Sequence, residues 1–158
     1  MQTNALFYTI QKGTVSTGDY VNWSHYLLEN GVSSPSVNII SSFSFGESIF
    51  EVEVYFNKAL NELEIQKPTF EICARAYIAY LAKEIIKANN HSVTFDLAYI
   101  IFRIVASDLQ YPDDLIEWYE ISEMIDELRY GDIPKEFNED EVILRINNAV
   151  NIFLGLND

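Results

Sequence analysis

The segment from residue 94 to residue 110 is apolar around most of the circumference of a helix, and this restricts the folds open to the chain. Its sequence is TFDLAYIIFRIVASDLQ, in which only Asp96, Arg103, Ser107 and Gln110 form a narrow polar stripe. A helix of this kind must be covered by other elements on most of its sides. We therefore expect it to lie inside a helical bundle, with Thr94 as its N-cap.

Seven further segments show helical patterns and complete the expected bundle. They span residues 4–12, 19–30, 35–43, 48–64, 69–88, 112–130 and 138–154. The segment 48–64 opens with a strand-like alternation, but the later recurrence of its apolar residues at helical spacing favours a helix. Asn89 and Asn90 suit a C-cap of the segment 69–88. Asn138, with Glu141 three residues later, predicts a capping box.

Proline and glycine mark the ends of these segments. Each of the four prolines, Pro35, Pro68, Pro112 and Pro134, suits a helix start, and the six glycines fall between periodic segments. No hairpin dipeptide separates two alternating runs. The predicted fold class is therefore all-α, a single-domain bundle or array of about seven helices joined by short loops over residues 1–158. A solenoid is the alternative, and no repeated sequence period supports it.

Negative charge is concentrated in one part of the chain. The 158 residues carry 24 acidic and 10 basic side chains, which gives a net charge of −14. Residues 108–141 hold 13 of the acidic side chains and only two basic ones, Arg129 and Lys135. This balance argues against direct binding to nucleic acid or to an anionic membrane surface. It suits a basic protein as partner.

The cysteine content and the beginning of the chain favour the cytoplasm. Cys73 is the single cysteine, so no intrachain disulfide can form, and its apolar helical neighbours predict a small buried side chain. The first residues lack the basic and long apolar stretches of a signal peptide. No uncharged apolar run approaches the ~18 residues of a membrane-spanning helix.

The segment 112–130 is the candidate partner-binding surface. On a helical wheel, one face is expected to meet the core and carries Leu115, Trp118, Ile121, Ser122, Ile125 and Leu128. The other face carries the candidate binding residues Asp113, Ile116, Glu117, Glu120, Glu123, Met124 and Glu127. Its carboxylates are spaced three or four residues apart and are therefore neighbours on a helix.

Two interpretations of the acidic face are open. Like charges at this spacing destabilise a helix by ~0.2–0.5 kcal/mol per pair, so folding alone does not explain them. The face either keeps the protein soluble or docks a basic partner. The near absence of lysine, and the apolar Ile116 and Met124 among the acids, favour docking. No calcium loop of the D-x-D-x-D-G type supports a metal site.

The docking interpretation makes two predictions about structure. Reversal of Glu117 and Glu120 to Lys is expected to leave the fold intact or slightly more stable, because repulsion along the helix falls. Carboxylates buried in the core and paired with Arg103 or Arg145 would contradict a docking surface.

Signatures of catalysis are absent from the sequence. There is no phosphate-binding glycine loop, zinc-protease helix or nucleophile elbow, and His25 and His91 (expected in a helix and a loop) have no second ligand at metal spacing. We therefore expect no enzyme activity, no cofactor and no metal. The enzyme alternative rests on Asp96, Arg103 and Asp108, which could line a cleft if the helix that carries them is buried.

Three stretches carry patterns of helix packing. Residues 19–45, DYVNWSHYLLENGVSSPSVNIISSFSF, contain W-x-x-x-L-L-x-x-G before a short serine-led helix. Residues 51–65, EVEVYFNKALNELEI, contain Y-F-x-x-A-L-x-E-L-x-I, and residues 111–131, YPDDLIEWYEISEMIDELRYG, resemble a P-x-D-L-x-x-(F/W)-Y-x-L acidic helix. Together they resemble a family of small bacterial helical proteins of unknown function. Similar proteins occur among the immunity proteins of polymorphic toxin systems. The resemblance covers about residues 19–154 and implies no catalytic residue.

These observations lead to one functional expectation and its alternative. We expect a cytoplasmic protein-binding protein of the immunity type, which neutralises a basic toxin, such as a nuclease, through its acidic helical surface. The alternative is a small structural or scaffolding domain without a toxin partner. Aromatic residues make up 14% of the chain, so a homodimer built on an exposed apolar patch is also compatible with the sequence.

Overall fold

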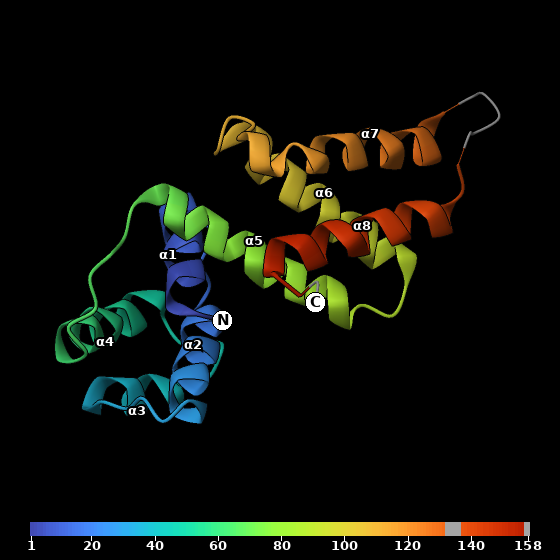
Figure 1. The fold of residues 1–158 in the computed structure, drawn as a ribbon. Helices are drawn as coiled ribbons and strands as arrows, with labels where there is room; N and C mark the ends of the chain where they lie inside the picture. Colours follow the sequence, from blue (N-terminus) through green and yellow to red (C-terminus); the bar gives the residue numbers. More distant parts are fainter. Residues whose placement is uncertain (132–136, 157–158) are drawn as a thin grey trace. The chain divides into compact units, whose positions relative to one another are not determined.

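All secondary structure in the described part of the chain is helical. The computed structural model describes residues 1–131 and 137–156, which form eight α-helices and one 3-10 turn (Figure 1). This confirms the all-α prediction of about seven helices. The chain divides into two compact units, Met1–Tyr77 and Ile78–Asp158, and each is described by itself below. A single domain over residues 1–158 stays a prediction.

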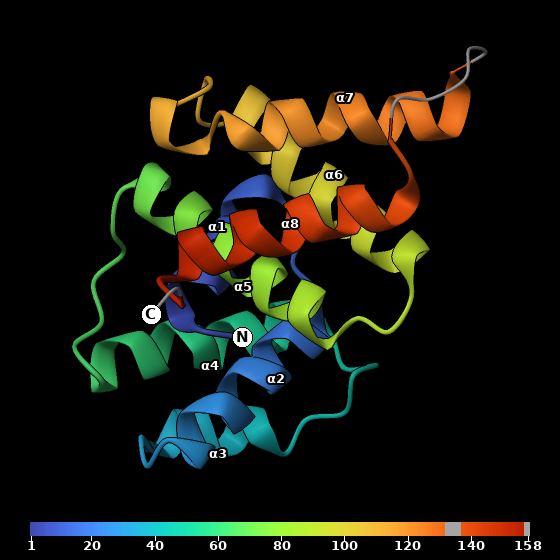
Figure 2. The ribbon, with the colours of Figure 1, turned by 45° about the vertical axis from the view of Figure 1, so that its right-hand side comes forward.

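The first unit has an aromatic core. It contains α1 (Thr3–Lys12), α2 (Thr17–Glu29), α3 (Pro35–Ser41), α4 (Ile49–Glu62) and the beginning of α5 (Phe70–Lys87). α3 packs against both α2 and α4 (Figure 2). The ring of Phe56 lies 4.9 Å from those of Trp23 and Tyr20 and 6.0 Å from that of Phe7. The indole N–H of the buried Trp23 donates to Thr3 Oγ1 at 3.0 Å, so its polar atom is satisfied inside the core.

A carboxylate ties the end of α4 to the start of α3. Ser36 donates its backbone N–H and its hydroxyl to Glu62, at 3.0 and 2.7 Å. The N-cap Ser34 accepts from the backbone N–H of Val37 at 3.3 Å. Hydrogen bonding by Ser34, and then by Ser36, lowers the pKa of Glu62. The negative charge at a helix N-terminus is also favourable. Glu62 therefore stabilises the first unit in its ionised form.

We predict that Glu62→Gln makes the first unit less stable at neutral pH and less sensitive to acid. A lowered pKa in the folded state contributes stability that is present above the unfolded pKa and is lost as pH falls through the folded value. The difference between wild type and variant should therefore shrink below about pH 4, the ordinary range of a glutamate. Urea unfolding at a series of pH values measures it. Glu64→Gln is the control, and a difference that does not change with pH would contradict the prediction.

The second unit is built around three helices that contact one another. It contains the rest of α5, then α6 (His91–Ser107), the 3-10 turn η1 (Asp113–Leu115), α7 (Glu117–Tyr130) and α8 (Glu139–Leu154). α6, α7 and α8 contact each other pairwise (Figure 1). The core side chains at most 2% exposed include Ile101, Leu115, Trp118, Ile121, Ile125 and Ile146.

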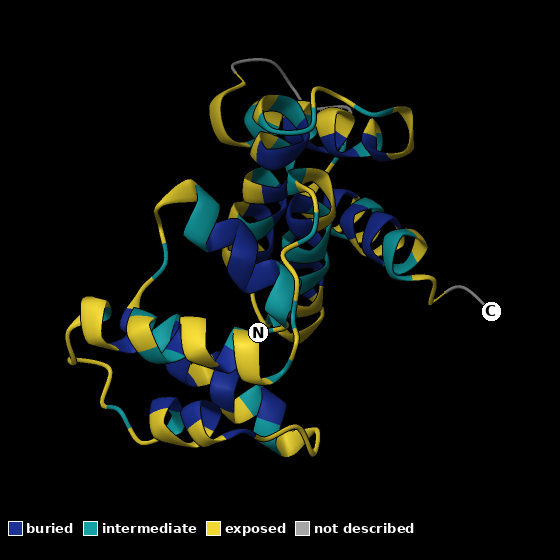
Figure 3. Cartoon of the chain, turned by 90° about the vertical axis from the view of Figure 1, so that its left-hand side faces the viewer, coloured by how far each residue is buried: buried dark blue, intermediate teal, exposed yellow. Residues whose placement is uncertain are grey.

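The predicted core face of the segment 112–130 is confirmed. Leu115, Trp118, Ile121, Ser122 and Ile125 are buried, and Leu128 is partly exposed. Buried and exposed residues alternate around the helices with the helical period, which Figure 3 shows in dark blue and yellow. The capping box of Asn138 and Glu141 at the start of α8 is also confirmed.

The start of α6 differs from the prediction. Asn90, rather than Thr94, is its N-cap, and the Asn90 side chain accepts from the backbone N–H of Val93 at 2.9 Å. Thr94 lies inside the first turn and donates its hydroxyl to the backbone oxygen of Asn90 at 3.2 Å. The predicted role of Asn90 as part of a C-cap pair is therefore wrong. His91, predicted in a loop, is the first residue of the helix. The preceding Asn90 acts as N-cap, because its side-chain oxygen accepts a backbone N–H of the first turn.

The start of α7 also differs from the prediction. Pro112 does not begin the long helix but precedes η1, and α7 begins five residues later at Glu117. Gln110 and Tyr111 both have left-handed backbone angles, with φ of 57° and 56°. This turn reverses the chain after α6, and the Tyr111 N–H donates to the Val105 oxygen at 3.0 Å. Asp113 therefore lies in the 3-10 turn, one turn before the helix that carries the other candidate acids.

Several further predictions concern single residues. Cys73 is buried, as predicted, and burial raises the pKa of its thiol. Pro35 occupies the first turn of α3, as predicted. Pro134 and Lys135 lie outside the described residues. Within residues 1–131 and 137–156, no helix has the length and apolarity needed to span a membrane.

Candidate partner-binding surface

One flank of α7 is fixed to α6 by polar and aromatic contacts. Arg129 Nη2 donates to Asp96 Oδ1 at 2.6 Å, and Tyr99 Oη donates to Asp126 at 3.4 Å. Burial raises the pKa of Tyr99, with a smaller contribution from the Asp126 carboxylate. Arg129 is one of the two basic residues in the segment 108–141. Because it pairs with α6, it does not neutralise the carboxylates on the far side of α7.

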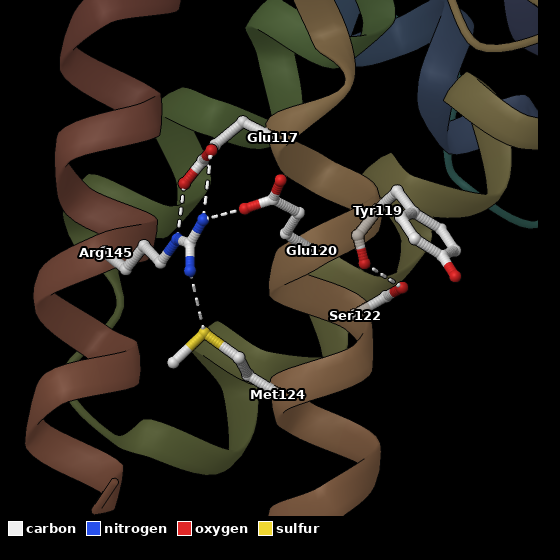
Figure 4. Close-up of polar contacts among 6 residues, drawn as sticks. All are labelled: Glu117, Tyr119, Glu120, Ser122, Met124 and Arg145. Carbon is white, nitrogen blue, oxygen red and sulfur yellow. Dashed lines mark hydrogen bonds and ion pairs between the residues drawn. The ribbon is translucent and has the colours of Figure 1, made fainter. Parts of the chain in front are cut away.

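The other flank of α7 is fixed to α8 by Arg145. Its Nε donates to Glu117 Oε1 at 2.5 Å and its Nη2 to Glu117 Oε2 at 3.2 Å, so the contact is bidentate. Nη2 also pairs with Glu120, and Nη1 lies 3.4 Å from Met124 Sδ. Figure 4 shows the guanidinium enclosed by these three side chains of α7. Hydrogen bonding to Glu117 raises the pKa of Arg145 further. Arg145 is therefore a permanent cation in contact with the acidic face.

Carboxylates of α7 that were both buried in the core and paired with Arg103 or Arg145 would contradict a docking surface. The structure shows the pairing with Arg145 but not the burial. Glu117 and Glu120 pair with Arg145, but their side chains stay 42% and 53% exposed and are not in the core. Arg103 is exposed on α6. The structure therefore leaves both acids at the surface and partly neutralises them. The charge count of the segment 108–141 omits this cation, because Arg145 lies beyond that segment in the sequence.

The side of α7 that faces away from both neighbours forms an outer ridge. We define the outer ridge as Ile116, Glu120, Glu123, Glu127 and Tyr130, which recur every three or four residues. All five are exposed, with Ile116 at 45% and Tyr130 at 76%. No cation within residues 1–131 and 137–156 pairs with Glu123 or Glu127. The outer ridge thus combines three carboxylates with an apolar side chain at one end and an aromatic one at the other.

The seven candidate binding residues therefore fall into three groups. Glu117, Glu120 and Met124 gather around Arg145. Ile116, Glu123 and Glu127 belong to the outer ridge, which shares Glu120 with the first group. Asp113 is exposed in η1, apart from the helix. Sequence analysis named Arg145 only as a partner that would contradict docking, and it did not predict that Arg145, the only basic residue of the segment 138–154, pairs with these acids at the surface.

The residues behind the enzyme alternative do not form a cleft together. Asp96 and Arg103 are exposed, and Asp96 is paired with Arg129. A pocket of about 230 Å³ lies at the start of α6, lined by His91, Ser92, Phe95, Leu128, Arg129 and Glu139. Asp96, Arg103 and Asp108 do not line it. In the described part of the chain, no cluster of three or more histidine, cysteine, aspartate or glutamate side chains could hold a metal ion.

The two histidines have ordinary surroundings. His25 is exposed, with Nε2 3.1 Å from the Ser41 backbone oxygen. His91 is exposed at the start of α6, with Nδ1 3.2 Å from Glu139 and Nε2 3.8 Å from Asp140. Both carboxylates come from the first turn of α8. His91 therefore links the starts of two helices.

The fold and the outer ridge define an all-α protein with an acidic helical surface. Comparison with protein-family models, curated proteins and solved structures finds no match to this chain. The resemblance to immunity proteins stays a prediction.

Arg145 changes the prediction for charge reversal on α7. We predict that Glu117→Lys destabilises the second unit by about 1 kcal/mol, because it removes a bidentate ion pair and places two cations together. The matched variant Glu123→Lys reverses the same charge on the outer ridge. It should be neutral or stabilising by ~0.2–0.5 kcal/mol, because it only relieves repulsion. Urea unfolding followed by circular dichroism compares the two, and equal effects would show that Arg145 does not hold Glu117 in solution.

Proposed function

We propose that this protein binds a basic protein partner through the outer ridge of α7 and acts as an immunity-type protein that neutralises it. The observation that carries the proposal is the outer ridge itself. Glu123 and Glu127 are exposed there, and no cation of the described residues pairs with them. A toxin that acts on nucleic acid is cationic where it meets phosphate, so such a ridge can cover that surface.

The energetics of α7 support a functional reason for the ridge. Neighbouring carboxylates cost the helix ~0.2–0.5 kcal/mol per pair and contribute nothing to packing. A face that serves only solubility mixes both signs of charge, whereas the outer ridge carries one sign. Ile116 and Tyr130 add exposed apolar surface at its ends, as protein interfaces commonly do. Charge would then steer association, and the apolar ends would add contact area.

The scaffolding alternative makes a different prediction about gene context and binding. An immunity protein is expected to be encoded beside a gene for a toxin domain, and we propose that both act in the cytoplasm. A scaffolding domain would lie among unrelated genes. If the protein is an immunity protein, cells that express the neighbouring toxin should survive when they also express the wild-type protein. Survival of these cells is a direct functional assay.

We predict that Glu123→Lys/Glu127→Lys weakens binding to the natural partner by slowing association. The reversed charges repel a basic surface, and the loss should be largest at low ionic strength, where screening is weakest. Immobilised wild type and variant are exposed to extract of the native host at low and high ionic strength. Retained proteins are identified by mass spectrometry, and association rates are then measured with the purified partner.

Glu51→Lys/Glu64→Lys is the matched control for this experiment. It makes the same change in net charge at two exposed positions of the first unit. The proposal requires a basic protein that is retained by wild type and by this control and is lost from the α7 variant. Equal retention by all three proteins would reject the outer ridge as the docking surface.

A homodimer is a separate proposal, and it has a specific surface. Phe50 and Val54 lie one turn apart on α4 and are 77% and 52% exposed. Exposed apolar side chains that lie together are typical of contact surfaces. We predict that Phe50→Asp lowers the mass in light scattering if wild type dimerises through this surface. A monomeric mass for wild type at high concentration would contradict the proposal.

A further inference from the structure

The contact between α7 and α8 shows how the acidic face binds a guanidinium group. Glu117 offers both carboxylate oxygens to Nε and Nη2 of Arg145, and Glu120 accepts from Nη2 on the other side (Figure 4). Met124 Sδ lies against the third nitrogen, Nη1, at 3.4 Å. All three nitrogens are therefore engaged. The planar fork of arginine matches a carboxylate in this bidentate way, whereas the ammonium group of lysine is a point charge.

The guanidinium is held at the surface, where it can be exchanged. The side chain of Arg145 is 35% exposed, and those of Glu117 and Glu120 are 42% and 53% exposed. Water and salt reach such a pair and weaken it. Arg145 also stands on the flank beside the outer ridge, with which the cluster shares Glu120. A cation that arrives along the ridge would therefore meet this cluster next.

We propose that Glu117, Glu120 and Met124 form a guanidinium-binding site, which Arg145 fills in the unbound protein and an arginine of the partner fills in the complex. This rests on the proposed function, because it names the chemistry of the partner at the same surface. The partner is an arginine-bearing protein segment. Arg145 is then an internal competitor, and the site accepts the partner only while Arg145 is released.

The competition has a measurable consequence. Apparent affinity is the intrinsic affinity reduced by the fraction of molecules in the binding-competent state. If Arg145 leaves the site open in about a tenth of the molecules, its removal should raise the affinity for an arginine ligand about tenfold. A ligand that carries lysine in place of arginine gains less, because it cannot reproduce the bidentate contact.

The test uses labelled peptides of eight arginines and of eight lysines, with binding followed by fluorescence anisotropy. Arg145→Gln should bind the arginine peptide about tenfold more tightly than wild type, with a smaller gain for the lysine peptide. Arg129→Gln is the matched control, because it removes the same charge from a pair with Asp96 outside the cluster. It should change the binding of both peptides equally. Unchanged or weaker arginine binding by folded Arg145→Gln, or a gain equal to that of Arg129→Gln, would overturn the proposal.

A measurement on the wild-type protein keeps the test decisive if Arg145→Gln does not fold. The Nε–H group of Arg145 has its own nitrogen NMR signal, which reports its bond to Glu117. The arginine peptide should shift this signal towards that of a solvated arginine as it binds. If the peptide binds while the signal stays in place, Arg145 is not displaced and the proposal is wrong.

The outcomes also separate this inference from the proposed function. Dependence of partner binding on Glu123 and Glu127, together with no effect of Arg145→Gln on the arginine peptide, would overturn only the exchange. A gain for the arginine peptide, together with partner binding that ignores the outer ridge, would overturn only the proposed function.

Discussion

The acidic surface of α7 depends on the burial of the opposite side of the same helix. Trp118, Ile121 and Ile125 are at most 2% exposed, and complete burial of such a side chain contributes about 1.5–3 kcal/mol. Repulsion between neighbouring carboxylates costs ~0.2–0.5 kcal/mol per pair. The apolar term is several times larger, so the helix stays folded although its outer side repels itself. Burial therefore permits the charge pattern but does not explain its presence.

Arg129 and Arg145, the two arginines that pair α7 with its neighbours, lie on the flanks of α7 rather than on its outer ridge. Arg129 reaches sideways to Asp96 on α6, and Arg145 reaches from α8 to Glu117 and Glu120. Each fixes α7 to one neighbour. If either guanidinium lay between Glu123 and Glu127 instead, it would cancel the field that these side chains project into the solvent. The arrangement thus separates charges that hold the helices together from charges that face outward.

The periodicity of the sequence predicted the helices and the buried side of α7, because both depend on residues close together in the chain. The buried positions Trp118, Ile121 and Ile125 repeat every three or four residues, and this spacing alone defines a face. The helix starts were less predictable. Asn90 and Thr94 are both good N-caps, and only tertiary packing decides between them. The left-handed turn at Gln110 and Tyr111 has no glycine to announce it.

The candidate site was predictable as a set of exposed acids but not as an arrangement. Glu117 and Arg145 are 28 residues apart, and their contact depends on how α7 packs against α8. No local pattern reports such a distance. The same limit applied to Arg129, which the charge count placed against the acids of α7 and the structure pairs with α6. Counting charges along a segment overstates neutralisation by its own residues and omits neutralisation from other helices.

The position of Arg145 suggests how the two parts of the acidic face would act in sequence. Fields from exposed charges extend over a Debye length of about 8 Å at physiological ionic strength, which is longer than a hydrogen bond. Glu123 and Glu127, which pair with no cation of residues 1–131 and 137–156, therefore act on an approaching partner before contact. Glu117 is already neutralised by Arg145 and adds little to this field, so it acts only when a guanidinium is close enough to replace that of Arg145. Long-range attraction would then belong to the outer ridge, and the choice of arginine over lysine to the cluster on its flank.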